Sequence, residues 1–331
     1  MMKKLKLIIF GFVLFGMESR AQDFHLSIYD AGPLFLNPAM TGVVDSKARI
    51  HAQYRNQWSS VAFKPFTTAL ISADVPYGKW GFGVQIINMN AGIGSYNVFQ
   101  GLLSAAYSIS IDKNKYHNIS FGLQAGITQK AIVSDLYSFD NQYSNKDGGY
   151  FDKTLSTDEK YTAQAQILPQ VNAGILYFYS KQQSRINPFL GISAFNLTHA
   201  RETFFDQNNY LPVRIQGHLG VRVNITEMLY LLPKVLIMGQ GTAFEQAYAL
   251  DAGYYLKPGK LFLLAGYVLR AHDASIASIG VKKEEYILKF GYDFNTSTLQ
   301  TATKTQGAME ISFTYMFGKE KVKKLRHCPR L

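Results

Sequence analysis

The sequence predicts an all-β protein, a transmembrane β-barrel of about 14 antiparallel strands with an N-terminal plug-like segment and a short basic C-terminal tail. Three observations predict this fold. Polar and apolar residues alternate with a period of two in about fourteen segments of roughly ten residues, the length of a tilted membrane-spanning strand. Every second connection between these segments is a tight polar turn. Aromatic residues lie beside those turns, as in the interfacial girdle of a membrane barrel.

The first residues predict export. Residues 1–21 have a basic start, an apolar centre from Leu7 to Phe15 and a small-x-small ending at Ala21. This pattern is typical of a secretory signal peptide, and we expect cleavage before Gln22. The apolar run is shorter than the roughly 20 residues that a membrane-spanning helix needs. We therefore expect the mature protein to leave the cytoplasm.

The composition fits an exported membrane protein rather than a disulfide-rich secreted domain. Apolar residues make up 47% of the chain, with 21 Tyr and 23 Phe but a single Cys, so no disulfide can form within the chain. Without the four basic and one acidic residue of residues 1–21, the chain has 30 basic and 22 acidic residues, a net charge of +8. No aromatic residues alternate with basic ones on one exposed face, so nucleic-acid binding is not expected.

Residues 22–46 precede the first strand and do not alternate. Prolines cannot join a regular strand ladder, and glycines permit tight bends. An apolar N-terminus that is not a strand needs cover, and the mouth of the barrel is the nearest cover. We expect a lumenal plug or hatch whose distinctive residues are Asn37, Pro38, Ala39 and Gly42. The alternative is a disordered periplasmic leader, which the apolar content of the segment disfavours.

The predicted barrel covers residues 47–317. In its first strand the polar residues Arg49, His51, Gln53 and Arg55 alternate with a mostly apolar set. Since the apolar face meets lipid, the polar face points into the lumen. The predicted lumenal site residues are Arg49, Arg55, Arg214, Arg222, Asp293 and Glu310, with Glu245, Asp251 and Lys289 as further inward candidates. Because an unpaired buried charge is costly, these charges should pair, and we expect a plugged or constricted interior rather than an open pore.

The connections orient the barrel. The long links cover residues 131–162, 199–211 and 295–306, and external loops of such barrels are long whereas periplasmic turns are short. An even number of strands then places both ends of the barrel in the periplasm. The predicted girdle at the short-turn interface consists of Tyr77, Trp80, Tyr116, Tyr179, Tyr230, Tyr255 and Tyr286.

Residues 318–331 form a basic tail with six basic residues and one acidic, a net charge of +5. We expect it to steer toward an acidic periplasmic partner. The predicted partner-binding residues are Lys319, Lys321, Lys323, Lys324, Arg326, Cys328, Pro329 and Arg330. Any disulfide of Cys328 would join another chain. The alternative is a solvated charge run that only keeps the end soluble.

The sequence offers no pattern for catalysis or for a cofactor. The seven histidines are scattered without metal-ligand spacing, and neither a nucleophile elbow nor a phosphate loop is present. We therefore predict no catalytic, cofactor-binding or metal-binding residues.

Several short motifs together carry a family resemblance. The runs "LNPAMTG", "YRNQW", "PFTTALISADVP" and the terminal "CPRL" resemble the PorP/SprF family of outer-membrane proteins, across nearly the whole mature chain. The resemblance implies a fourteen-stranded outer-membrane barrel of the type IX secretion and gliding machinery. It also implies contact with periplasmic components of that machinery, or retention of a secreted adhesin at the cell surface. Family members usually end in an aromatic residue, whereas this chain ends in Leu331.

Three functional hypotheses remain. The first is a non-enzymatic outer-membrane component of type IX secretion that anchors or adapts surface proteins. The second is a transporter like the fatty-acid channels, whose N-terminal hatch carries a similar Asn-Pro-Ala element. A transporter of apolar solutes needs a side opening or an apolar site, and the predicted lumen is polar. The third, a barrel hydrolase, lacks a nucleophile–base pair.

Overall fold

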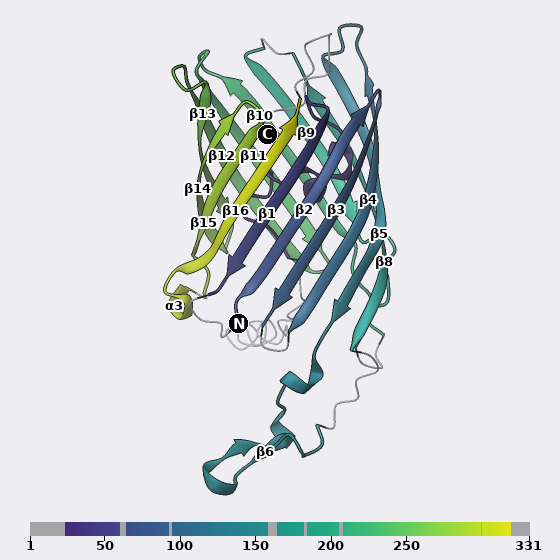
Figure 1. Cartoon of the computed structure of the whole chain (residues 1–331), viewed down its shortest axis with the longest axis vertical. Helices are drawn as coiled ribbons and strands as arrows, with labels where there is room; N and C mark the ends of the chain where they lie inside the picture. Colours follow the sequence, from purple (N-terminus) through teal and green to yellow (C-terminus); the bar gives the residue numbers. More distant parts are fainter. Residues whose placement is uncertain are drawn as a thin grey trace, which may run out of the picture.

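The computed structural model describes residues 24–59, 64–92, 95–157, 164–181, 184–204, 208–298 and 300–318. Fourteen antiparallel strands of this described chain close into a barrel (Figure 1). In sequence order they are β1 (Ala48–Gln57), β2 (Phe66–Tyr77), β3 (Trp80–Ala91), β4 (Tyr96–Ser110), β5 (His117–Ala131), β8 (Ala165–Tyr179), β9 (Ile186–Phe195), β10 (Arg214–Asn224), β11 (Leu229–Gln240), β12 (Ala243–Leu256), β13 (Leu261–Arg270), β14 (Ala274–Lys283), β15 (Tyr286–Asn295) and β16 (Gln306–Phe317). The predicted fold class is confirmed.

The barrel closes where its first strand meets its last. β1 and β16 pair antiparallel from Ala48 opposite Phe317 to Gln57 opposite Ala308. This register places Arg55 directly opposite Glu310. Closure leaves no strand edge in contact with lipid, where unpaired backbone groups could not be solvated.

The wall alternates as the sequence predicts. On β2, Ile71 is 57% exposed on the outside, whereas its neighbour Ser72 is 3% exposed inside. On β1, His51, Gln53 and Arg55 are all buried in the interior. Apolar side chains therefore form the surface that meets lipid, and polar side chains line the lumen.

Short and long connections lie at opposite ends of the barrel. Short turns join β2 to β3 and β14 to β15 at the end where β16 finishes (Figure 1). At the opposite end lie the longer loops, including the short helix α3 (Gln300–Thr303) before β16. None of the helices in the described ranges is long and apolar enough to cross a membrane.

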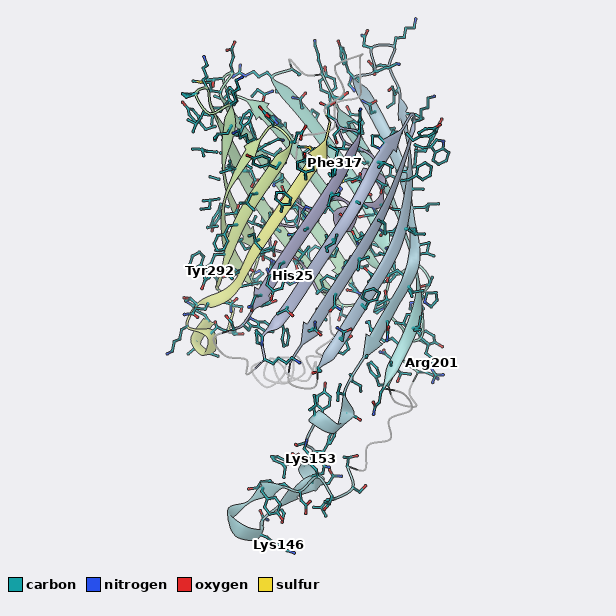
Figure 2. The ribbon with its side chains drawn as sticks, in the orientation of Figure 1. His25, Lys146, Lys153, Arg201, Tyr292 and Phe317 are labelled. Carbon is teal, nitrogen blue, oxygen red and sulfur yellow. The ribbon has the colours of Figure 1, made fainter. Side chains whose placement is uncertain are left out.

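The longest connection, between β5 and β8, projects well beyond the wall as an arm (Figure 1). We define the arm as residues 132–157. It contains η2 (Ser134–Leu136), η3 (Asp140–Gln142), β6 (Tyr143–Ser144), η4 (Lys146–Gly148) and β7 (Tyr150–Phe151). β6 and β7 pair as a small hairpin of their own. Figure 2 shows Lys146 and Lys153 on this arm, far from His25 inside the barrel.

The aromatic girdle is only partly as predicted. Tyr77 (75% exposed), Trp80 (49%) and Tyr286 (39%) are exposed on the outer surface. Tyr230 and Tyr255 are wrong as girdle residues, because both lie on the inward-facing side of their strands.

Tyr230 and Tyr255 each lie on the same side of their strand as a charged residue of the lumen. Tyr230 has the same parity on β11 as Lys234, and Tyr255 has the same parity on β12 as Asp251. The guanidinium of Arg222 lies 3.8 Å above the Tyr230 ring. Interior charges near the mouth are thus packed against aromatic faces, so an aromatic ring beside a turn does not by itself indicate lipid.

The apolar core lies between the wall and the N-terminal residues, not between two sheets. We call residues 24–46 the inserted segment. It contains α2 (Pro33–Leu36) and η1 (Pro38–Met40). Its buried apolar side chains cluster with those of the inner wall, namely Tyr29, Leu36, Ala39, Met40 and Val43 with Leu176, Phe178, Phe189, Leu232, Leu236, Ala247, Ala249, Val268 and Ile276.

Candidate functional site

The Asn-Pro-Ala element lies deep inside the barrel. Asn37, which is completely buried, caps the short η1 helix by accepting a hydrogen bond from the Ala39 nitrogen at 2.9 Å. Its amide nitrogen donates to the Ile175 carbonyl at 3.1 Å and lies 3.2 Å from His218 Nε2. One side chain therefore both shapes the inserted segment and attaches it to strands β8 and β10.

Glycines in the wall make room for this element. A Cβ on Gly122 would lie 2.2 Å from the Ala39 nitrogen, and a Cβ on Gly174 would lie 2.0 Å from Asn37 Oδ1. Both contacts are far closer than atoms can approach. On the other side of the segment, Gly42 has a positive φ of 68° and its Cα packs against Gly81. The backbone thus approaches the wall at positions where a side chain would exclude it.

Arg49 and Asp74 hold the end of the inserted segment. Arg49 donates to both carboxylate oxygens of Asp74, at 2.9 and 2.8 Å, in a bidentate pair. Arg49 also donates to the Met40 carbonyl at 3.2 Å, and Asp74 accepts from the Gly42 nitrogen at 2.7 Å. Because both charged groups also bond the segment's backbone, the pair is satisfied only when the segment is in place.

Arg55, Asp293 and Glu310 form a second attachment at the seam of the barrel. Arg55 lies 2.9 Å from Asp293 and 3.3 Å from Glu310. Glu310 accepts hydrogen bonds from the backbone nitrogens of Ser27 and Ile28, at 2.8 and 2.7 Å. The Ser27 hydroxyl donates to Asp293 at 2.6 Å and also contacts the Arg55 guanidinium. Residues predicted only as lumenal charges are thus joined through the N-terminal backbone.

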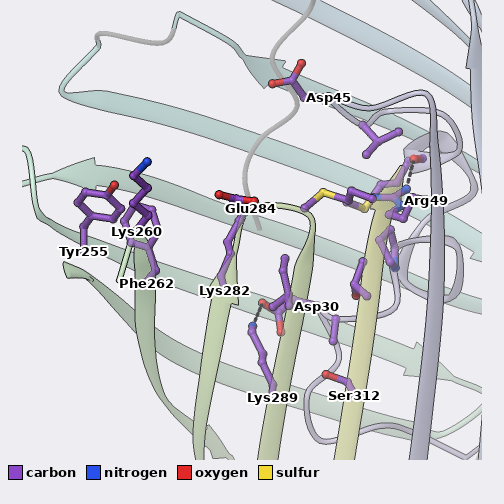
Figure 3. Close-up of a pocket in the computed structure, with 17 residues that line it drawn as sticks. Asp30, Asp45, Arg49, Tyr255, Lys260, Phe262, Lys282, Glu284, Lys289 and Ser312 are labelled. Carbon is purple, nitrogen blue, oxygen red and sulfur yellow. Dashed lines mark hydrogen bonds and ion pairs between the residues drawn. The ribbon is translucent and has the colours of Figure 1, made fainter. Parts of the chain in front are cut away.

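Asp30 places a charge of the inserted segment between two wall lysines. It lies 3.5 Å from Lys289 (Figure 3) and 2.5 Å from Lys234. Both lysines also contact Asp251. The four charges cancel. Burial alone would raise the pKa of Asp30, but the charges of Lys234 and Lys289 outweigh it and hold that pKa below its usual value.

His25 lies near a further group of wall charges. Its Nε2 is 2.8 Å from Arg270, and its Nδ1 is 3.5 Å from Glu245. Arg270 also pairs with Asp273 at 2.7 Å. Charged wall residues on several strands around the barrel therefore converge on the inserted segment.

The two remaining predicted lumenal arginines differ in what they contact. Arg214 packs its guanidinium over Phe195 at 4.4 Å and over Phe35 of the inserted segment at 5.7 Å. Arg222 packs over Tyr230 and donates to Asn224 at 3.1 Å. Arg222 thus faces inward, toward the ring of Tyr230.

The inserted segment has a cavity on each side. On the long-loop side lies the outer chamber, about 970 Å³, with Phe24, His25 and Phe35 among its lining residues. On the short-turn side lies a cavity of about 340 Å³, lined by residues that include Asp30 and Lys289 (Figure 3). The inserted segment contributes different residues to the two linings, which share none, so it lies between the cavities.

Some residues of this site were not predicted from the sequence. Asp30 and Asp74 were missed because neither belongs to a charged repeat. Gly122 and Gly174 could have been found from the sequence. Each is a glycine at an inward-facing position of a strand, which indicates that another part of the chain approaches there. The predicted signal peptide and the partner-binding residues Lys319 to Arg330 lie outside the described residues. Within the described ranges, no group of three or more His, Cys, Asp or Glu side chains could hold a metal ion.

These features define an outer-membrane β-barrel whose lumen is occupied by its own N-terminal residues. The chain belongs to the family described as "Type IX secretion system membrane protein PorP/SprF", which matches residues 18–315. It is therefore a type IX secretion system membrane protein and a component of that system. No curated protein matches the chain.

Solved structures share the fold at low sequence identity. The Ralstonia pickettii toluene transporter TbuX aligns with a TM-score of 0.51 and 9% identity, over 87% of this chain and 94% of that one. A deletion mutant of the monoaromatic hydrocarbon channel TodX aligns with a TM-score of 0.50 and 10% identity, over 86% and 94%. At this identity the similarity shows the barrel fold alone.

Proposed function

We propose that this protein is a non-enzymatic anchor or adaptor, which holds a secreted surface protein at its long-loop end and joins periplasmic components of the secretion system at its short-turn end. The observation that carries the proposal is the occupied lumen. Charged groups on β1, β2, β11, β15 and β16 bind the inserted segment. A barrel whose interior is used to bind its own chain is better suited to present its two ends than to conduct solutes.

The arm supports a partner at the long-loop end. Tyr143, Tyr150 and Phe151 are 46–50% exposed. The rings of Tyr143 and Phe151 pack at 5.3 Å, and the Asp152 nitrogen donates to the Gln142 carbonyl at 2.8 Å. The hairpin is thus internally bonded while its aromatic rings remain in water. Exposed aromatic residues are typical of protein interfaces.

The test replaces residues 141–153 by a short Gly-Ser link in cells that lack the native copy. We expect an inserted barrel and release of a surface protein into the medium, measured by mass spectrometry of medium and cell surface. A double substitution, Tyr150→Ser with Phe151→Ser, removes the rings at constant loop length. The control inserts Gly-Ser after Gly241, at a two-residue loop of the same end. Unchanged surface retention of every secreted protein in both arm variants would contradict this role for the arm.

The rival function is a transporter with the inserted segment as its hatch. The barrel fold shared with a toluene transporter and the buried Asn-Pro-Ala element favour it. The amide groups of the outer chamber and the charged cluster around Asp30 disfavour passage of an apolar solute, because such a solute would replace hydrogen-bond and ion-pair partners that it cannot substitute. Uptake of a labelled fatty acid that depends on this protein would support the rival.

A further inference from the structure

The lining of the outer chamber is rich in side-chain amides. Its walls come from β2–β5 and β8–β10 and from the loop before β10. The lining amides are Gln57, Gln85, Gln100, Gln124, Gln170, Asn172, Asn196 and Asn209. Two opposite charges of the lining, Lys130 and Glu202, pair with each other at 2.6 Å. The Arg214 guanidinium also belongs to the lining, where it packs over the rings of Phe195 and Phe35. Apart from these charged groups and His25, the chamber offers neutral hydrogen-bonding groups.

Four of these amides form a connected ladder across β4, β8 and β5. Gln100 donates to Gln170 at 2.6 Å, Gln170 donates to Asn172 at 3.3 Å, and Asn172 donates to Gln124 at 2.8 Å. Linked amides fix one another's orientation, so the wall presents donors and acceptors in defined places.

The ladder is incomplete at the chamber wall. Gln124 Nε2 and Gln85 Oε1 have no hydrogen-bond partner among the described residues, although the two side chains are only 1% and 2% exposed. Trp58 Nε1, at the end of β1, is likewise buried without a partner there. Buried polar groups are nearly always paired, so the donor and the acceptor left over on this cavity wall are groups that water or a ligand in the chamber would pair. Such a partner must both accept and donate hydrogen bonds.

Aromatic rings complete the chamber. Phe24 and Phe35 of the inserted segment stack with centroids 5.6 Å apart and an interplanar angle of 25°. Near the mouth, Trp58 packs against Phe66 at 5.0 Å. An aromatic face is apolar and carries the negative end of the ring quadrupole, which suits the C–H groups of a flat, partly apolar ring.

We propose that the outer chamber binds a short neutral oligosaccharide presented from the long-loop side. Sugar hydroxyls both donate and accept, which matches the two unpaired amide groups. Sugar C–H faces match the aromatic rings, and a hydrocarbon would leave the amides unpaired. The volume of about 970 Å³ suits a compact ligand. The proposal depends on the chamber and not on the anchoring function.

The first test measures binding by the full-length protein in a detergent without a sugar headgroup. The chain has two tryptophans, so Trp80→Phe leaves Trp58 as the only fluorescent indole. We expect a saturable fluorescence change with maltotriose, cellotriose or chitotriose. The same trisaccharide attached to a lipid or to a peptide then distinguishes a membrane glycolipid from a glycoprotein as its source. Absence of binding to all neutral sugars on a broad glycan array overturns the proposal, as does preferential binding of a sugar-free Asn- and Gln-rich peptide.

The second test uses matched variants on one strand. Gln124→Leu removes the end of the ladder and should weaken sugar binding at least tenfold, whereas Gln129→Leu changes an exposed amide on the outer face of β5 and should not. Gln85→Leu provides an independent test on β3. Heat-modifiable migration on gels checks that each barrel is folded. Unchanged affinity in folded Gln124→Leu or folded Gln85→Leu overturns the assignment.

Discussion

Asp30 is the residue through which the inserted segment can be loosened without altering the wall. Asp30→Asn leaves Lys234, Lys289 and Asp251 in place, so the cluster gains a net charge of one while the segment is docked. When the segment is undocked, the mutation leaves the barrel wall unchanged. The substitution therefore acts on the docking equilibrium and not on strand pairing.

The size of the effect follows from the burial of the pair. The side chains of Lys234 and Asp30 are 3% and 5% exposed. Removing one partner of a buried ion pair costs about 3–5 kcal/mol. Since each 1.4 kcal/mol is a factor of ten, the docking equilibrium should fall by roughly two to three and a half powers of ten. Other attachments, including the hydrogen bonds of Glu310 to Ser27 and Ile28, still hold the segment.

Single-channel recording in planar bilayers measures this change. We expect the wild-type barrel to show no current steps and Asp30→Asn to show brief openings. A variant without residues 24–42 is the reference for an open barrel. Glu227→Gln, at an exposed short turn, is the control for loss of one negative charge. Adding Lys234→Met to Asp30→Asn leaves Lys289 and Asp251 balanced and should reduce the openings. A wild-type barrel that already conducts like an open porin, or a silent Asp30→Asn, would refute the reasoning.

Two further changes test the wall and the tail. Gly122→Ala places a methyl group against the Ala39 backbone and should also cause openings. Gly101→Ala should not, because its methyl group would lie 3.9 Å from the Phe99 ring. Identical traces from both variants would show that the close approach is unimportant. Ending the chain after Gly318 should leave a heat-modifiable barrel that no longer co-purifies with periplasmic secretion components at about 150 mM salt, where charges are screened beyond roughly 8 Å. Recovery of the same partners would leave the tail as a solubilising end only.

The wall was predictable because each position has only two environments. A strand in a membrane barrel alternates between lipid and lumen, so residues such as Ile71 and Ser72 reveal their sides by chemistry alone. The same logic failed at Tyr230 and Tyr255, since an aromatic ring fits either a membrane interface or the interior beside an arginine. Residue type alone does not distinguish the two environments. The side of the strand on which neighbouring charged residues lie does distinguish them.

The contacts of the inserted segment were less accessible to sequence reasoning. The charges were predicted to pair, but the partners of Arg55 are 238 and 255 positions away. They are set by the pairing of β1 with β16 and of β16 with β15. Asp30 carries no local pattern that would indicate its lysine partners. The amide ladder from Gln100 to Gln124 likewise arises from three strands brought side by side by pairing.

The seam between β1 and β16 has a consequence for assembly. Glu310 belongs to the last strand of the barrel to be synthesised, and it binds the backbone of Ser27 and Ile28, among the first residues of the described chain. Arg55 lies opposite Glu310 on β1, the strand with which β16 must pair for the barrel to close. The binding site for the inserted segment is therefore completed only when β16 pairs with β1. A cylinder that closes out of register would misplace Glu310 and leave the backbone of Ser27 and Ile28 unbound, so correct closure and seating of the inserted segment are coupled.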